Sequence, residues 1–520
     1  MPTLVRKDAW KLSTISMWEP TLLWYAKAVG EMCTRPATDP TSWRFQAGVH
    51  GYNKRTDPFT GAGPIPKKAV TDKFWGQCQH GSWFFLPWHR MYLGFFEQIV
   101  RAAVVKLGGP ADWTLPYWNY SDATNPNAKT LPPAFREPKL PGGSPNPLFV
   151  IRGVNILRAP AIDGGNPAAI PDRDVDITGC LGKTFFSPTT DITVGDLGFG
   201  GPDTAANHDG HFFGVRSIES VPHNAIHMDV GGDQTLGWMT DPDTAALDPI
   251  FWMHHANIDR LWAVWNRMSA SNSDPTVPVN VGGRKITWAT SIKFNFYDAT
   301  GKPVSMTPSQ VTDTKVPFNY DYDDTSNPLP KAKPAKAVLA AAMTKSMAPQ
   351  RPEMVGASGK KLTLTGSPQS AAISIQPPTG PAKAKTAKAG KTQGLRVTAQ
   401  PAPEGKTYLH IENVVSKKAH TTYEVYVNLP ENPDAGAYEE HYAGSMHLFG
   451  VVRASTRSAR SAGNGLSFSM DITGLVESLK QKNAWDEKRV RVAFLPRAGV
   501  EGKAAKHDPI TVGRISIYQA

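Results

Sequence analysis

Residues 78–97 read CQHGSWFFLPWHRMYLGFFE and place His80 nine positions before His89. Apolar residues then recur at helical spacing, which predicts a helix over residues 89–108 that His89 opens. Glu97 lies two turns further along this helix. The same periodicity predicts further helices over 21–33, 223–230 and 248–268. The amino-terminal part of the chain is therefore expected to be mainly helical, with long loops between the helices.

Further histidines occur in three other segments: AGVHGYNK carries His50, PHNAIH carries His223 and His227, and DPIFWMHHANIDRLW carries His254 and His255. His223 and His227 project from one helical face about one turn apart, so their imidazoles can chelate a divalent metal. The zinc-protease motif HExxH needs a glutamate after the first histidine, where this chain has Asn224, so that enzyme's general base is missing. Two histidines that hydrogen-bond within a helix packing seam are the alternative.

The histidines have no matching cluster of acids or thiolates. Such a set favours a metal that accepts imidazole ligands throughout, and copper, zinc, iron and nickel all meet this condition. Redox-inert zinc is the less expected choice, because the surroundings are aromatic. An apolar pocket of this kind suits an aromatic substrate and dioxygen. The aromatic residues concerned are Trp83, Phe84, Phe85, Trp88 and Phe251.

Composition divides the chain into three parts. Residues 1–326 are rich in aromatic residues and histidines and form the predicted helical domain. Residues 327–395 are rich in Lys, Ala and Pro, which is typical of a linker that proteases cut easily. Residues 396–520 contain short β-branched and aromatic runs separated by turn residues, which indicates an all-β domain of sandwich type.

The net charge of +11 comes from the linker region. The chain has 56 Lys and Arg against 45 Asp and Glu, and residues 331–396 alone hold ten Lys, two Arg and one acid, again +11. These basic residues have no aromatic reader residues among them, so nucleic acid is not an expected partner. No apolar run is long enough for a membrane-spanning helix. No signal peptide precedes the first domain, which leaves a cytoplasmic protein or one exported with a leader absent from this sequence.

Two of the histidine segments resemble the signatures of type-3 copper proteins, the family that includes tyrosinases and polyphenol oxidases. The pattern HxxxxFLPWHRxxLxxxE over residues 80–97 is similar to their copper-A signature, and DPxFWxxHxxxD over residues 248–259 is similar to their copper-B signature. The resemblance implies a four-helix bundle around two copper ions, with His254 as a neighbouring histidine. The ligands that it implies are His50, His80 and His89 for copper A and His223, His227 and His255 for copper B.

The carboxy-terminal strands are similar to the shielding domain of plant polyphenol oxidases. The chain thus resembles a latent tyrosinase, which uses O2 as cosubstrate to hydroxylate monophenols and to oxidise o-diphenols to o-quinones once proteolysis removes that domain. A catechol oxidase, active on diphenols alone, is the alternative, and an O2 carrier like hemocyanin is a more distant one. The implied partners are phenolic substrates such as tyrosine and catechols, an activating protease and a copper chaperone.

The resemblance also assigns roles close to the coppers. Glu219 and Asn224 would hold a water that acts as base for the phenol, whose pKa is near ~10. A carboxylate at a helix start and a capping amide are the alternative reading of these two residues. Cys78 would form a thioether with the imidazole of His80, as in fungal and molluscan relatives, and a buried thiol is the alternative.

Phe449 would be the shielding residue that occupies the place of the substrate ring, with Leu448 and Met446 as neighbours. A core aromatic of the β sandwich is the alternative. Pro242 stands where many plant enzymes have a bulky residue over copper A, which suggests an open entrance. Arg90 and Asp259 follow ligand histidines and are expected to orient helices by a charged hydrogen bond, with a surface ion pair as the alternative. Tyr320 and Tyr322 are similar to the tyrosine motif that ends the plant catalytic domain, and Arg6 resembles its stacking partner. Closure of the core is the alternative role of these three residues. Whether Cys33 and Cys180 pair is left open.

Overall fold

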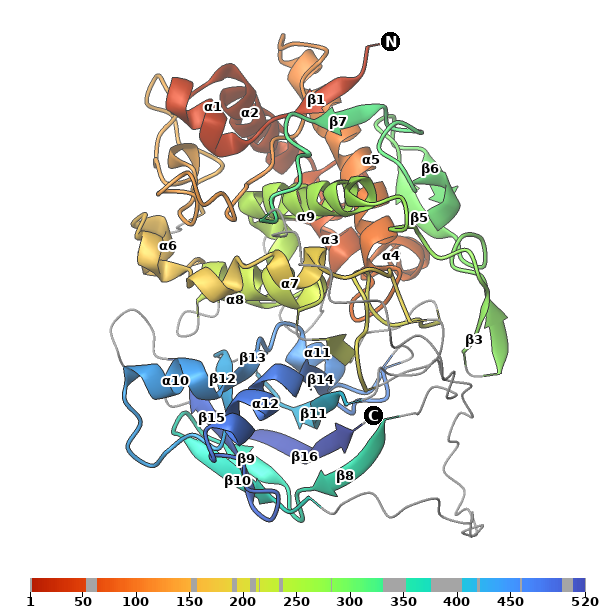
Figure 1. The fold of residues 1–520 in the computed structure, drawn as a ribbon. Helices are drawn as coiled ribbons and strands as arrows, with labels where there is room; N and C mark the ends of the chain where they lie inside the picture. Colours follow the sequence, from red (N-terminus) through yellow and green to blue (C-terminus); the bar gives the residue numbers. More distant parts are fainter. Residues whose placement is uncertain are drawn as a thin grey trace.

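Two domains make up the described chain, and Figure 1 draws the helical domain above a domain built from strands. The structure is a computed structural model that describes residues 2–52, 63–150, 157–188, 194–205, 212–214, 216–232, 237–281, 283–330, 352–375, 405–418, 421–458, 461–497 and 508–519. We call the described residues up to 330 the helical domain and those from 352 onward the β domain. The predicted fold class, a mainly α domain followed by a β sandwich, is confirmed.

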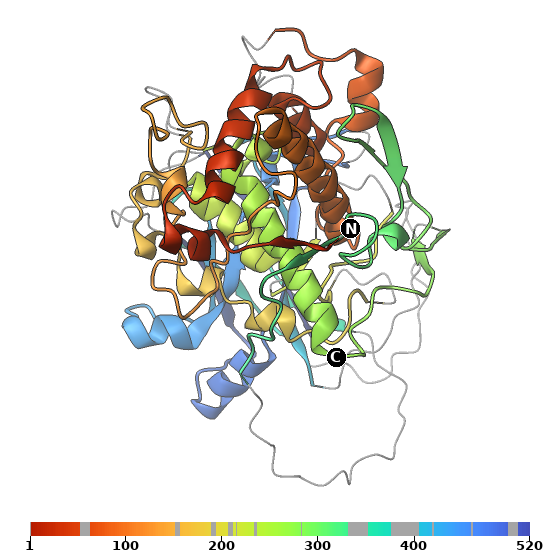
Figure 2. The same ribbon diagram turned by 90° about the horizontal axis from the view of Figure 1, so that it is seen from above.

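Helices α5 (Phe85–Lys106) and α9 (Pro249–Met268) run side by side through the centre of the helical domain, as Figure 2 shows from above. α9 begins as predicted, because the Asp248 carboxylate accepts the Ile250 N–H and Pro249 occupies the first helical position. α5 begins four residues earlier than predicted. Pro87 is tolerated there, since the first turn of a helix has no backbone partners for its N–H groups.

The other helices pack around these two. They are α1 (Ala9–Ile15), α2 (Pro20–Thr34), α3 (Trp43–His50), α4 (Lys68–Phe74), α6 (Pro160–Asp163), α7 (Thr178–Leu181) and α8 (Ala225–Gly231). A π-helical segment, Glu219–Asn224, leads directly into α8. Short paired strands complete the domain: β1 (Leu4–Arg6) with β7 (Tyr320–Tyr322), β3 (Val279–Val281) with β4 (Arg284–Ile286), and β5 (Phe294–Tyr297) with β6 (Pro303–Met306).

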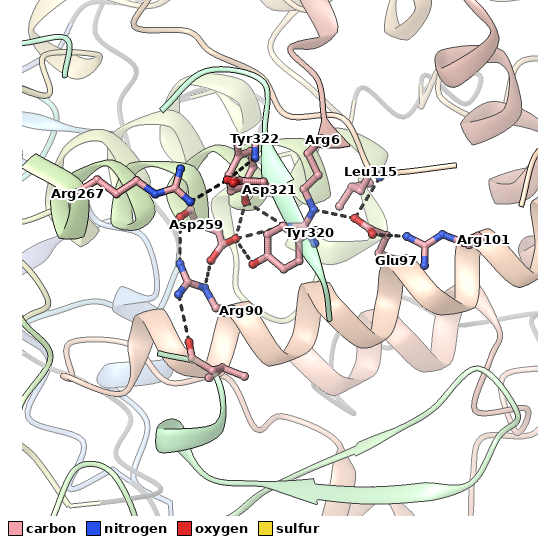
Figure 3. Close-up of polar contacts among 11 residues, drawn as sticks. Arg6, Arg90, Glu97, Arg101, Leu115, Asp259, Arg267, Tyr320, Asp321 and Tyr322 are labelled. Atoms are coloured by element: carbon pink, nitrogen blue, oxygen red, sulfur yellow. Dashed lines mark hydrogen bonds and ion pairs between the residues drawn. The ribbon is translucent and has the colours of Figure 1, made fainter. Parts of the chain in front are cut away.

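A buried polar network joins the two ends of the helical domain to α5 and α9 (Figure 3). The Arg6 guanidinium donates to Glu97 at 2.7 Å and lies over the Tyr320 ring, 3.7 Å from its centroid. Asp259 accepts hydrogen bonds of 2.5 Å from the Arg90 Nε and from the hydroxyls of Tyr320 and Tyr322. The network therefore holds β1 and β7 against the two central helices.

The β domain is a sandwich of two sheets. One has the order β10-β15-β12-β13, and the other has the order β2-β14-β11-β16-β8 with β9 also paired to β16. Its strands are β8 (Glu353–Ala357), β9 (Leu362–Leu364), β10 (Gln369–Ile373), β11 (Thr407–Val415), β12 (Tyr423–Val427), β13 (Tyr442–Met446), β14 (Leu466–Asp471), β15 (Val490–Pro496) and β16 (Ile510–Gln519). Apolar residues from both sheets, such as Val425 and Ile517, fill the space between them.

The β domain differs from the prediction in two ways. The predicted linker, residues 327–395, includes β8, β9 and β10, which pair with β15 and β16 and belong to the sandwich. Residues 360–378 have a strand-like sequence, but the Lys, Ala and Pro on both sides led to their assignment to the linker. Only the long-range pairing shows that they belong to the sandwich. The domain also contains helices α10 (Ala435–His441), α11 (Val451–Ala454) and α12 (Thr473–Gln481), so it is not all-β. The predicted start at residue 396 lies outside the described residues.

The two domains exchange secondary structure at their boundary. β2 (Phe212–Gly214) belongs to the helical domain by sequence but pairs in parallel with β14 of the β domain. Phe213 lies in the apolar core of the β domain, and the Ser469 hydroxyl bonds to the N–H and the C=O of Gly195, both at 3.1 Å. Backbone pairing and side-chain contacts thus fix the β domain against the helical domain. Among the described helices, none is both long and apolar enough to cross a membrane.

Candidate metal centre

Four helices bring the predicted histidines together. His50 ends α3, His89 lies in α5, His227 in α8 and His255 in α9. His80 lies five residues before α5, and His223 lies in the π-helical segment that leads into α8. The ring centroids of His50, His80 and His89 lie 5.5 to 5.9 Å apart, and those of His223, His227 and His255 lie 4.6 to 5.6 Å apart. The His89 and His255 rings stack at 4.2 Å. The structure therefore brings together all six predicted ligands as two adjacent groups of three.

Backbone carbonyls set the orientation of several rings. The Nδ1–H groups of His50, His89 and His227 donate to the carbonyls of Pro242, Phe85 and Met239 at 2.8, 2.8 and 2.9 Å. His223 Nδ1–H donates instead to the Asn224 side-chain oxygen at 2.8 Å. A proton held on Nδ1 leaves the lone pair on Nε2 for a metal ion. These four imidazoles are thus oriented as ligands before any ion binds.

Burial keeps the imidazoles neutral. Desolvation lowers the pKa of His50 and of His223 to about 3, and it lowers the pKa of His80, His89, His227 and His255 well below the ordinary value. Neighbouring histidines lower most of these pKa values further, because two charged rings would repel each other. A neutral imidazole is the form that binds a metal.

The donor atoms form two groups that each suit one ion. The ligand atoms of His50, Cys78, His80 and His89 lie within 4.8 Å of one another, and so do those of His223, His227, His254 and His255. His227 Nε2 and His255 Nε2 are only 3.4 Å apart, and a metal ion between them would satisfy both lone pairs. The buried Nε2 atoms of His50 and His223 also have no hydrogen-bond partner within the described chain. The residues present therefore fit a centre of two metal ions.

His254 lies closer to this centre than its prediction as a neighbouring histidine required. Its ring stacks on His223 with a centroid distance of 5.3 Å, and neither of its nitrogens has a hydrogen-bond partner in the described part of the chain. Sequence reasoning separated it from His255 by resemblance to the copper-B signature alone. The structure shows both adjacent histidines of α9 facing the second donor group.

Cys78 lies in the first donor group. Its Sγ is 3.6 Å from His80 Nδ1 and 3.4 Å from His80 Nε2, which puts the sulfur beside the ring carbon bonded to both nitrogens. The same sulfur lies 3.4 Å from His89 Nε2. The contact is non-covalent at these distances, and the thioether stays a prediction. No disulfide joins Cys33 and Cys180, and the Cys180 thiol donates to the Ile177 carbonyl at 3.3 Å.

Glu219 connects the two halves of the centre. Its carboxylate accepts the backbone N–H of Gly81 at 2.7 Å, immediately after His80, while its own backbone lies four residues before His223. Burial raises its pKa to about 8, although the N–H groups of Gly81 and Ser82 act in the opposite direction. The Asn224 side-chain oxygen accepts a hydrogen bond from the His223 ring. Both predicted catalytic residues therefore lie at the centre and are buried.

The side chain of Phe449 enters this centre from the β domain. Its ring stacks on His227 at 4.0 Å with an interplanar angle of 16°, and it meets His80 edge to face at 5.4 Å. Phe449 belongs to the apolar core of the helical domain, whereas Leu448 and Met446 belong to the core of the β domain. Gly450 has φ +78 and its Cα faces the Pro242 ring, so the chain turns back directly after Phe449.

Comparison with known proteins gives the family. Residues 40–268 match the common central domain of tyrosinase, residues 291–335 match the polyphenol oxidase middle domain, and residues 351–520 match a domain of unknown function. The chain is 36% identical to tyrosinase HcTyr1 of Hahella sp. (strain CCB-MM4), with 96% of this chain and 97% of that one covered. It is 26% identical to the chloroplastic polyphenol oxidase of Malus domestica, with 91% and 73% covered.

Solved structures agree on the fold. Latent apple tyrosinase superposes with a TM-score of 0.56 at 22% identity, covering 100% of this chain and 98% of that chain. A latent aurone synthase gives a TM-score of 0.54 at 20% identity, covering 99% and 89%. Together with the two histidine groups, which fit a type-3 dicopper centre, these matches lead to one conclusion. The chain belongs to the tyrosinase and polyphenol oxidase family of copper oxidoreductases.

Proposed function

We propose that this chain is a latent tyrosinase that hydroxylates monophenols to o-diphenols and oxidises o-diphenols to o-quinones with O2. The observation that carries the proposal is the Phe449 ring, which stacks on His227 between the two histidine groups. An aromatic ring in that position supports a centre that can accommodate a phenol there. The same side chain excludes a phenol while it remains in place.

The metal ligands of the proposal are the six histidines already described. A pair of copper ions bound there would supply the exchange of electrons with O2 and the attachment point for the phenol oxygen. The chain's part is to hold neutral rings in fixed orientations, which the carbonyls of Pro242, Phe85 and Met239 support. The aromatic and aliphatic walls exclude water, and Phe251 lies 4.2 Å from the His255 ring.

Hydroxylation needs the phenolate, so a base must accept the phenol proton. Glu219 is the proposed base, acting through a water. Its burial raises its pKa to about 8, nearer to a phenol pKa of ~10 than an ordinary carboxylate lies. Asn224 orients the His223 ring through its side-chain oxygen, and its proposed role is to keep that ligand in register with Glu219.

One observation favours the alternative, a catechol oxidase that acts on diphenols alone. The Glu219 carboxylate already accepts the Gly81 N–H at 2.7 Å, and an oxygen so engaged is a weaker base. A diphenol needs no such strong base. An O2 carrier of the hemocyanin kind is a further alternative, and it would bind O2 reversibly without forming quinone.

Latency is the second part of the proposal. Phe449 blocks the centre as long as the β domain is docked, and an activating protease would cut the chain between the domains. An intramolecular blocking group competes at a high effective concentration, so soluble phenols displace it poorly. The activating protease and a copper chaperone for loading remain predicted partners.

The decisive experiment compares tyrosine and catechol as substrates of the copper-loaded chain, before and after cleavage between the domains. Quinone absorbance from both substrates, appearing after cleavage, supports a latent tyrosinase. Quinone from catechol alone supports the catechol oxidase. Reversible oxygenation without quinone supports the carrier.

A matched pair of variants then tests the base. Glu219→Gln should lower the rate of tyrosine oxidation at least ~100-fold. The rate of catechol oxidation should stay within a few-fold of the original. Glu97→Gln, a change of the same kind on α5 outside the centre, should lower both activities together through stability. Equal losses on tyrosine and catechol for Glu219→Gln would remove it as the base.

A further inference from the structure

Between the two domains lies a buried cluster of ionisable groups that the proposed chemistry does not use. We call Arg497, Asp174, Asp229 and His447 the interdomain cluster. Asp174 ends the short 3-10 helix Asp172–Asp174 of the helical domain and Asp229 lies in α8, whereas Arg497 follows β15 and His447 follows β13 of the β domain. The side chains of Asp174 and His447 are 1% exposed, and that of Arg497 is 12% exposed.

Arg497 bridges the two aspartates. Its Nη1 donates to one oxygen of Asp174 and, at 3.2 Å, to Asp229, while its Nη2 donates to the other oxygen of Asp174 at 3.2 Å. Its Nε lies 3.5 Å from Glu424 of its own domain. This two-pronged contact uses the planar fork of the guanidinium, which a lysine could not reproduce.

Undocking the β domain would separate these charges. The neighbouring carboxylates of Asp174 and Asp229 would then remain on the helical domain without Arg497. Arg497 would keep only Glu424 as a partner. Truncating one partner of a buried charge pair at an interface mainly speeds dissociation, because the remaining charge is left without its partner. The cluster is thus suited to hold the domains together.

The cluster is also connected to the blocked centre on both sides. Asp229 lies two residues after His227 in α8, and His447 lies two residues before Phe449. His447 Nε2 is 3.6 Å from the Asp174 carboxylate, and its Nδ1 lies 3.3 Å from the Thr422 hydroxyl. The segment that carries Phe449 is therefore anchored beside the helix that carries the histidine on which Phe449 stacks.

We propose that Arg497 is the positioning residue that keeps the β domain docked, and that holding the domain and blocking the centre are tasks of different residues. Arg497 binds the acidic pair Asp174 and Asp229, whereas Phe449 fills the ring site. The effect of this contact on activity rests on the proposed function, but the docking itself does not. Loss of Arg497 weakens the docking of the β domain while Phe449 itself stays intact.

The test uses the full chain with a recognition sequence for a site-specific protease inserted between Pro330 and Glu353. After cleavage, gel filtration and the dissociation constant of the two fragments report docking without any substrate. Arg497→Met should weaken fragment association at least ~30-fold, the size expected for a truncated buried charge pair. Arg514→Met is the matched control, because Arg514 is 45% exposed and pairs with Glu412 within the β domain. It should leave association unchanged.

A second variant guards against a misfolded β domain. Asp174→Asn removes the same contact from the helical side and should weaken association in the same direction. In the uncut chain both variants should raise quinone formation from catechol at least ~10-fold with copper content unchanged. Unchanged association in either correctly folded variant overturns the proposal. Weakened association without quinone from any variant keeps the docking role and instead contradicts the proposed enzymatic function.

Discussion

The two domains each contribute one phenylalanine to the other's core, and the consequences differ. Phe449 of the β domain enters the helical core and stacks on a histidine of the metal centre. Phe213 of the helical domain enters the β core beside Phe468 at 6.1 Å, in a core that contains none of the predicted ligands. One insertion therefore concerns access to the centre, and the other concerns the joint between domains. The comparison shows that the ring at the metal centre and the strand joint occupy separate parts of one interface, so the proposed blocking and the docking can be tested separately.

The domains also differ in what their cores contain. The helical core surrounds a set of buried histidines with aromatic residues, and its rigidity depends on polar anchors such as the Asp259 network of Figure 3. The β core is built mainly from aliphatic residues between two sheets, such as Val492 and Ile515. A change in the helical core should thus alter chemistry, whereas a change in the β core should alter stability or docking.

The largest effect is expected from removing a ligand of the helical core. His89→Ala should reduce the copper content from two ions per chain to one. It should lower the activity of the cleaved enzyme by more than ~100-fold, which exceeds the loss typical of removing a residue that only hydrogen-bonds to a ligand. His410→Ala is the control, since His410 is equally buried but lies in β11. Metal analysis and quinone absorbance measure both. If His89→Ala still bound two coppers, the expectation that changes in the helical core alter the chemistry would be wrong.

The next effect concerns where the chain is cut. A cut between Pro330 and Glu353 separates the complete β domain from the helical domain. A cut between residues 375 and 405 leaves β8, β9 and β10 on the fragment that carries the helical domain. These strands remain paired with β15 and β16 of the second fragment. We expect the first cut to raise activity at least ~10-fold on dilution and the second to leave latency intact, because strand pairing replaces the broken bond.

Both cuts can be read from the same experiment. Denaturing electrophoresis confirms cleavage, and gel filtration shows whether the fragments stay together. Activation by the second cut would mean that β8 to β10 do not hold the β domain, contrary to their buried residues Val355, Leu364 and Ile373.

Replacing Phe449 should separate blocking from docking. Phe449→Ala should raise the activity of the uncut chain on catechol ~10-fold while the fragments of the cut chain still associate. Its neighbour provides the matched control: Leu448→Ala should cost about 2–5 kcal/mol of β-domain stability through a cavity and leave the uncut enzyme latent. Thermal unfolding and quinone absorbance distinguish the two. Latency that survives Phe449→Ala would assign blocking to another side chain.

A smaller effect is expected from acid. Burial lowers the pKa of His447 to about 4 from an ordinary value of 6.5, so docking is lost progressively as the pH falls from 6.5 toward 4. Burial alone would raise the pKa of Asp174, but Arg497 and His447 lower it overall, so its contribution also disappears in acid. Both groups predict weaker association at pH 4.5 than at pH 7.5.

The fragments of the cut chain, followed by gel filtration, measure this without relying on activity. His447→Gln should flatten the upper part of the pH profile, because a glutamine cannot take up a proton. A profile that is identical with and without His447 would contradict the assignment.

The smallest effect is expected at Cys78. If the thioether forms, the intact mass of the copper-loaded chain falls below the sequence mass by two hydrogen atoms, and Cys78→Ser restores agreement. The sulfur already lies beside the His80 ring, so the bond would change ring mobility more than position. We expect the activity of Cys78→Ser to be only a few-fold below that of the original chain. An unchanged mass in an active, copper-loaded chain would exclude the crosslink.

Much of the helical domain could be predicted because its signals are local. The spacing of His80 and His89 and the Asp248-Pro249 helix start depend on a few adjacent residues. α9 therefore begins as predicted, and α5 differs from its prediction by four residues at its start. The strands β8 to β10 could not be separated from the linker, because a strand is stabilised by partners more than a hundred residues away. Helix α12 was missed for a related reason: its buried residues Val476 and Leu479 make a narrow apolar stripe in a segment dominated by strands.

By itself, the sequence determined the chemistry that this protein can hold: six histidines in two signature segments, an aromatic wall, and a carboxylate and an amide near the second segment. Only the tertiary structure decided how that chemistry is covered. The stacking of Phe449 on His227, the pairing of β2 with β14 and the contact of Arg497 with Asp174 and Asp229 join residues that are far apart in the chain. Ligand spacing is encoded locally by helical geometry, whereas docking depends on complementary surfaces that exist only after both domains have folded.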